Sequence, residues 1–264
     1  MVPGIDGVGR REDGRLVCFV ADDELVGPMA TRTVIDSRHS VVLPDGADVV
    51  KIAAGMNPAM SSWVVLRRRV PIEAGQSVLI LGATGNAGQM AVQIAKRLGA
   101  GRDQARLAAL PWTGADATVA LTDDADATAA ALARAASEVD LVIDHLWGRP
   151  AGDTITALLR ARADRSRALN WIQIGAIAGP TIELPSVALR SANFRLQGNG
   201  QGAVSTGRAW RNCPPSSMRS KAAVSRSPPS LYPSPTSKAC GPLPRSGACA
   251  PSWCPDPCRA VCTR

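Results

Sequence analysis

The stretch that decides the fold is residues 77–99, Ser-Val-Leu-Ile-Leu-Gly-Ala-Thr-Gly-Asn-Ala-Gly-Gln-Met-Ala-Val-Gln-Ile-Ala-Lys-Arg-Leu-Gly. Residues 78–81 form a short, unbroken apolar run, which predicts a strand buried on both faces. Apolar residues then recur at helical spacing over 90–98, and Gly99 fits a helix C-cap. The stretch therefore predicts a strand, a glycine turn, and a helix that packs one side onto a sheet.

The turn itself carries Gly82, Gly85 and Gly88 in the spacing Gly-x-x-Gly-x-x-Gly. The first N–H groups of a helix have no acceptor within the helix, and the helix dipole adds partial positive charge at that end. A diphosphate fits there if the backbone can come close, and side chains at the glycine positions would block it. This pattern predicts a dinucleotide site; a tight turn that binds no ligand is the alternative.

The net charge of +8 divides unevenly along the chain. Residues 207–264 hold nine Lys or Arg and one acidic residue, so the first 206 residues are neutral. The high isoelectric point therefore gives no case for a nucleic-acid-binding domain.

Cysteine follows the same division. Cys18 is the only cysteine in the first 206 residues, which suits a reducing cytoplasm. The other six are Cys213, Cys240, Cys249, Cys254, Cys258 and Cys262; the last four form one crowded run without the loop that usually separates two pairs of metal ligands. We find no N-terminal signal pattern and no long apolar run, so we expect a cytoplasmic protein without a membrane span.

Strand and helix patterns alternate along the main body, which predicts an α/β fold with a parallel, doubly wound sheet. We expect strands at 16–20, 30–35, 78–81, 117–121, 141–144, 171–175 and 194–198, and helices at 52–65, 104–110, 125–136 and 154–163. After the glycine-turn helix the chain passes to the next helix without room for a strand, so we expect the sheet to lack its second strand.

The patterns divide the chain into three parts. Residues 1–51 hold a few short strands, too few to close a barrel, so we expect the first part of that barrel to be absent from this chain. Residues 52–206 form the nucleotide-binding domain. Residues 207–264 contain 11 of the 20 prolines and predict a disordered tail, which we interpret as out-of-frame translation of a GC-rich gene.

Five stretches, residues 3–9, 42–46, 75–88 with the following helix, 142–144, and 171–175 together with 194–202, resemble the medium-chain dehydrogenase/reductase superfamily. The resemblance is to its zinc-free quinone oxidoreductase-like branch and covers about three quarters of the chain. It implies a Rossmann domain preceded by a GroES-like β-barrel, here partial, with NADPH bound in the cleft between them. The family is usually homo-oligomeric.

The resemblance also implies which residues hold the cofactor. The diphosphate turn would be Gly82, Ala83, Thr84, Gly85, Asn86, Ala87 and Gly88, and the nicotinamide would lie near Gly175, Ala176, Gly198 and Asn199. Ser61 stands where the family often has a Thr facing the nicotinamide, with a plain helix serine as the alternative. Arg102 resembles the arginine that holds the 2′-phosphate, with a solvated arginine as the alternative.

Other polar residues predict less. Zinc-dependent relatives carry a His-Glu pair where this chain has Ile5-Asp6, and Ile cannot ligate a metal, so we expect no catalytic zinc. His39 and His145 each stand alone, and an isolated histidine lacks the partners that orient a catalytic imidazole. We interpret Arg67-Arg68-Arg69 as a solvated helix end rather than a phosphate contact.

The function that follows is an NADPH-dependent oxidoreductase that passes a hydride to a quinone or an activated alkene. Its partner would be a small-molecule acceptor, with no nucleic acid and no membrane, and no acid–base triad is needed because proximity supplies most of the rate. The missing parts predict impaired activity. The alternative is a non-catalytic or unstable remnant that at most binds a nucleotide.

Overall fold

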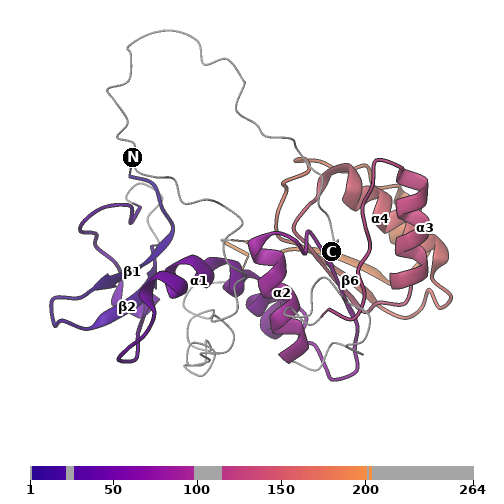
Figure 1. Cartoon of the computed structure of the whole chain (residues 1–264). Helices are drawn as coiled ribbons and strands as arrows, with labels where there is room; N and C mark the ends of the chain where they lie inside the picture. Colours follow the sequence, from indigo (N-terminus) through magenta and orange to yellow (C-terminus); the bar gives the residue numbers. More distant parts are fainter. Residues whose placement is uncertain (1, 22–26, 98–114, 201, 204–264) are drawn as a thin grey trace, which may run out of the picture.

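The computed structural model describes residues 2–21, 27–97, 115–200 and 202–203. Two sheets hold the strands (Figure 1): an antiparallel sheet in the order β1-β2-β3 and a parallel sheet in the order β4-β5-β6-β7. The antiparallel strands are β1 (Asp6–Arg10), β2 (Leu16–Val20) and β3 (Ser40–Val42). The parallel strands are β4 (Val78–Leu81), β5 (Leu141–Asp144), β6 (Leu169–Gln173) and β7 (Phe194–Gly198). This confirms the predicted α/β class.

Helices cover the parallel sheet. In Figure 1, α2 (Asn86–Arg97) lies to one side of β6, and α3 (Ala125–Ala136) with α4 (Gly148–Ala161) lies to the other. Their apolar faces close around β5, whose four residues are all buried. A strand buried on both faces favours apolar residues, which explains the Leu-Val-Ile run that precedes the buried Asp144. Two short helical segments are a 3₁₀ turn, η1 (Ser37–His39), and α5 (Ser186–Arg190).

One long helix joins the two sheets. Helix α1 (Val49–Val64) continues into a wider π-helical turn, η2 (Val65–Arg69), and packs against both α2 and β1. Met56 belongs to the core of the small sheet, whereas Val65 and Leu66 belong to the core of the parallel sheet. Val49–Arg69 is long and apolar enough to cross a membrane, but a core helix meets the same criteria, so this is weak evidence for a span.

Most predicted elements appear at their predicted places, and two strands do not. Residues 30–35 and 117–121 form no strand. Their β-branched residues favour an extended chain, but a strand also needs a neighbour, and neither segment pairs with a described strand. Val119 is instead buried in the core as part of an irregular segment. The predicted helix at 104–110, the predicted gap in the sheet around residue 100 and the predicted tail lie outside the described residues.

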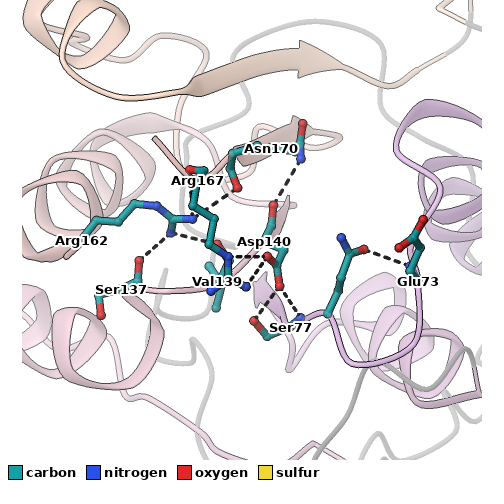
Figure 2. A network of polar contacts seen from close by, with 10 residues as sticks. Glu73, Ser77, Ser137, Val139, Asp140, Arg162, Arg167 and Asn170 are labelled. Carbon is teal, nitrogen blue, oxygen red and sulfur yellow. Dashed lines mark hydrogen bonds and ion pairs between the residues drawn. The ribbon is translucent and has the colours of Figure 1, made fainter. Parts of the chain in front are cut away.

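A polar network fastens the amino ends of the parallel strands (Figure 2). One carboxylate oxygen of Asp140 accepts the backbone N–H of Ser77 at 2.9 Å, and the other accepts Nε of Arg167 at 3.0 Å. Burial opposes the charge of Asp140, but the bonds from Ser77 and Arg167 hold its pKa below the usual range. The buried Arg162 donates to the carbonyls of Ser137, Val139, Arg167 and Ala168. This end of the sheet is thus closed by hydrogen bonds.

Candidate functional site

The glycine turn lies at the opposite, carboxyl end of β4. Gly82 leaves the strand with φ +82°, a conformation that L residues with side chains rarely adopt. The N–H of Gly85 donates to the Gly82 carbonyl at 3.1 Å, and the N–H of Gln89 donates to the Gly85 carbonyl at 2.9 Å. Gly85 is therefore the N-cap of α2, and the strand-turn-helix unit predicted from the sequence is confirmed.

The three glycines serve different purposes. A Cβ on Gly88 would stand 2.1 Å from the Gly82 carbonyl oxygen, and a Cβ on Gly82 would stand 3.1 Å from Leu146. The fold itself thus requires glycine at both positions. A Cβ on Gly85 would stand 3.5 Å from the Gly82 carbonyl oxygen, which is an ordinary van der Waals contact. Packing does not require glycine at position 85.

The first turn of α2 fits an anion. It holds no acidic residue, so the positive end of the helix dipole is not neutralised from within the turn. Ala83 is buried, the Thr84 carbonyl accepts the side chain of Gln89 at 2.9 Å, and the Asn86 amide donates to Ala54 of α1 at 3.4 Å. Residues 82–85 therefore form the turn, and residues 86–88 form the first turn of α2, whose N–H groups have no acceptor within the helix.

A buried carboxylate shapes the next loop. Asp144 ends β5, and its Oδ1 accepts the N–H groups of Leu146 at 2.8 Å and Trp147 at 3.0 Å. Its Oδ2 accepts the indole N–H of Trp171 at 3.1 Å. Burial raises the pKa of Asp144, and these three bonds oppose that rise. The carboxylate acts as a structural anchor for the turn between β5 and α4.

His145 stands between the ends of β4 and β6. Its N–H donates to the Leu81 carbonyl at 3.2 Å, and its own carbonyl lies 2.5 Å from where a Cβ on Gly175 would stand. Glycine at 175 is therefore needed for this close approach. Burial lowers the pKa of His145, and its Nε2 has no hydrogen-bond partner among the described residues. The interpretation of His145 as a histidine without an orienting partner agrees with this geometry.

A cavity of about 290 Å³ opens at the carboxyl ends of β6 and β7. It is lined by Trp147, Gln173, Ala176, Pro180, Leu196, Gln197 and Gly198. Ala176 and Gly198, both predicted to lie near a nicotinamide, thus share one cavity. Open α/β sheets bind their ligands at this edge, outside the carboxyl ends of the strands.

The other predicted residues meet at the junction of α1 and β7. The buried amide of Asn199 donates to the Ser61 carbonyl at 3.2 Å, and the Ser61 hydroxyl donates to the Pro58 carbonyl at 2.9 Å. That hydroxyl contact is the one expected of a plain helix serine. The role of Ser61 towards a cofactor stays a prediction, and Arg102 lies outside the described residues.

One arginine lies in a different environment from the predicted one, and three residues of the cavity were not predicted. Arg69 was expected to be solvated; it is half-buried, and its guanidinium donates to the Gly198 carbonyl at 2.6 Å. Arg67 and Arg68 are exposed, as expected. The cavity residues Trp147, Gln173 and Gln197 belong to no motif, and their position within three residues of the carboxyl end of a strand was the only available signal. Within the described ranges, no group of His, Cys, Asp or Glu could hold a metal, and the zinc-free interpretation stays a prediction.

Comparison with known proteins extends this picture. No family model matches the chain. A probable NADPH-dependent quinone reductase, tdiC of Emericella nidulans, is 28% identical over 213 residues, which cover 67% of this chain and 59% of that protein. The chain thus spans about three fifths of this relative's length.

Solved structures share the fold. Escherichia coli quinone oxidoreductase, solved in complex with NADPH, matches with a TM-score of 0.65 at 16% identity, covering 83% of this chain and 70% of its own. The quinone oxidoreductase of Thermus thermophilus matches with a TM-score of 0.55 at 24% identity, covering 75% of this chain and 61% of its own. These structures show that the chain shares the fold of quinone oxidoreductases, and the sequence similarity to the fungal relative agrees with the resemblance to the quinone oxidoreductase-like branch of the medium-chain dehydrogenase/reductase superfamily.

Proposed function

We propose that the chain binds NADPH through the glycine turn and passes a hydride to a quinone or an activated alkene. The observation that supports this proposal most is the glycine at position 85. It is the N-cap of α2, and a side chain there would not clash with the rest of the fold. A glycine that the fold does not need, at a helix N-terminus and at the carboxyl edge of a parallel sheet, is suited to the close approach of a diphosphate. The fungal relative named as a probable NADPH-dependent quinone reductase and the Escherichia coli enzyme solved with NADPH support the choice of dinucleotide.

The chain's contribution to the reaction would be to bind and orient. Bound NADPH would supply the hydride; the acceptor takes it with one proton from water, leaving NADP⁺ and a hydroquinone or a saturated product. The N–H groups at the start of α2 would hold the diphosphate, and Ala176 and Gly198 would line the space for the reacting ring. Holding the two reactants in contact is itself worth several orders of magnitude in rate.

The remaining assignments belong to the same proposal. We place the enzyme in the cytoplasm, with a small molecule as its acceptor and further copies of the chain as its partners. We also propose the division into a barrel remnant over 1–51, a nucleotide-binding domain over 52–206 and a tail over 207–264; helix α1 begins at Val49, just before the first boundary. The rival is a remnant that binds the nucleotide without turnover.

A charge placed on the N-cap tests the proposal. Asp and Asn are both good N-caps, so Gly85→Asp and Gly85→Asn should each leave α2 at least as stable as it is now. Only the aspartate repels a diphosphate, so we expect the dissociation constant for NADPH, from fluorescence titration, to rise about tenfold more in Gly85→Asp than in Gly85→Asn. Equal affinities in the two variants would contradict binding at this turn. Binding without menadione-dependent oxidation of NADPH would favour the remnant.

A further inference from the structure

Trp147 has an unusual backbone conformation. Its φ of +55° and ψ of −156° fall in a region that is essentially confined to glycine, and it is the only residue other than glycine with positive φ among the described residues. Conformations of this kind persist where the surroundings enforce them, and they concentrate at binding sites.

The surroundings fix this turn from three directions. Asp144 accepts the N–H of Trp147, and Trp147 forms a parallel bridge with Gly179. The next residue, Gly148, lies so close to Ala178 that an added Cβ would stand 2.5 Å from its carbonyl oxygen. The backbone therefore cannot relax without breaking the contacts of Asp144 and the 178–179 segment.

Trp147 lines the cavity in this conformation and also packs against the core of the parallel sheet. The ring is half-buried, and Ala176, Pro180 and Leu196 provide the other apolar parts of the lining. Gln173 and Gln197 add amides: the Gln173 amide nitrogen already donates to the Gly175 carbonyl at 2.9 Å, and the Gln197 amide can donate to a ligand's carbonyl oxygen. A flat apolar wall beside two amides suits a planar conjugated ring that carries carbonyl groups.

The cavity lies away from the glycine turn, and the nicotinamide proposed near Ala176 and Gly198 would share it with the acceptor, as contact between the two rings during hydride transfer requires. The cavity lies at β6 and β7, the second and third strands from β4. Neighbouring strands are about 4.8 Å apart, so this edge is roughly 10–14 Å from the glycine turn. A diphosphate held at the turn therefore leaves open the part of the cavity at Gln197 and Gly198, whereas Trp147, which follows β5, lies closer to the turn.

From these observations we infer that Trp147 determines acceptor specificity: its indole stacks on the ring of a planar aromatic quinone. The inference rests on the proposed function, which it narrows from quinones or activated alkenes to fused-ring quinones. It also gives the strained conformation of Trp147 a use, because the turn is what positions this residue at the cavity.

The test compares two substitutions at the same position in the full chain. Trp147→Phe keeps an aromatic ring, whereas Trp147→Leu keeps apolar bulk and removes the ring. We expect the calorimetric dissociation constant for menadione, without NADPH present, to rise roughly fivefold in Trp147→Leu and less than about twofold in Trp147→Phe. The constant for 2-cyclohexen-1-one, a non-aromatic acceptor, should change less than about twofold in both variants. Thermal unfolding of each variant confirms that folded protein is compared.

Each other outcome has a definite meaning. Menadione that fails to bind the wild type, or that binds both variants equally, overturns the inference. A loss of NADPH affinity in Trp147→Leu with unchanged menadione affinity also overturns it, since the ring would then serve the cofactor. Ring-dependent menadione binding without NADPH oxidation upholds the inference and counts against the proposed function. Menadione-dependent NADPH oxidation at the same rate in the wild type and both variants overturns the inference and supports the proposed function.

Discussion

The two ends of the parallel sheet are built on opposite principles. At the amino ends of the strands, Asp140 and Arg162 are enclosed by hydrogen bonds to neighbouring loops (Figure 2). At the carboxyl ends lie a cavity, a strained Trp147, and the buried Nε2 of His145 and Oδ1 of Asn199, for which the described residues provide no partner.

The difference between the two ends suggests which one stabilises the fold and which one binds a ligand. A buried polar atom without a partner costs free energy, so a fold keeps few of them without a reason. The amino end is fastened by the bonds of Asp140 and Arg162, although Nε of Arg162 has no partner among the described residues, whereas the carboxyl end holds the cavity, the strained Trp147 and two such atoms beside the fully bonded Asp144. We therefore propose that the amino end holds the strands together and that the carboxyl end binds the ligand.

The largest loss of stability should come from removing the hydrogen bonds of Arg162 at the amino end of the sheet. Arg162→Met removes the donor to four carbonyl groups, which are left in a site that water reaches poorly, and we expect a loss of about 3 kcal/mol in the free energy of unfolding. Urea denaturation followed by circular dichroism measures it. Arg160→Met, at an exposed position on the same helix, is the control and should cost under about 0.5 kcal/mol. Similar losses in the two variants would mean that the carbonyl contacts contribute little.

The next largest effect is a difference in stability cost between two glycine substitutions at the carboxyl end of the sheet. Gly88→Ala forces a Cβ against the Gly82 carbonyl and should cost about 2 kcal/mol of unfolding free energy, because the backbone of the turn must move. Gly85→Ala has room for its Cβ and should cost less than about 1 kcal/mol, the usual penalty for a weaker N-cap. Thermal unfolding of both variants checks the order. A larger cost at position 85 would remove the ground for calling that glycine unnecessary to packing.

The smallest effect is a difference in pH dependence between the two ends. Burial lowers the pKa of His145 below its ordinary 6.5, so its contribution to stability is complete above that pH and is lost as the pH falls below it. Hydrogen bonds hold the pKa of Asp140 below 3.8, so its contribution is lost only as the pH falls through more acidic values. The unfolding free energy of His145→Gln should therefore vary less than that of the wild type between pH 7 and pH 5. Parallel curves for the two proteins would contradict this.

The sequence predicts the regular part of the fold well. The bounds of β2, β4, β5, β7 and α3 agree with the structure, because unbroken apolar runs and a capping aspartate such as Asp124 are local signals. Helix α4 begins at Gly148 rather than at 154, since Pro150 is compatible with a first helical turn and does not have to precede it.

The site is predicted less completely, and for a physical reason. The turn over 82–88 is recognisable because one short segment contains its glycines. The cavity depends on Trp147, Gln173 and Gln197, which three separate strand ends bring together. Arg69 likewise reaches Gly198 only because α1 crosses from one sheet to the other. Contacts of this length leave no periodic or spacing signal along the chain.

Hydrogen–deuterium exchange with and without NADPH tests the central claim most directly. If the carboxyl end of the parallel sheet binds the dinucleotide, NADPH will slow exchange of the backbone amides over 83–88 and 145–148 and leave those around Asp140 and Arg162 unchanged. Unchanged exchange over 83–88 at saturating NADPH, or slowing confined to the amino end, would contradict the account.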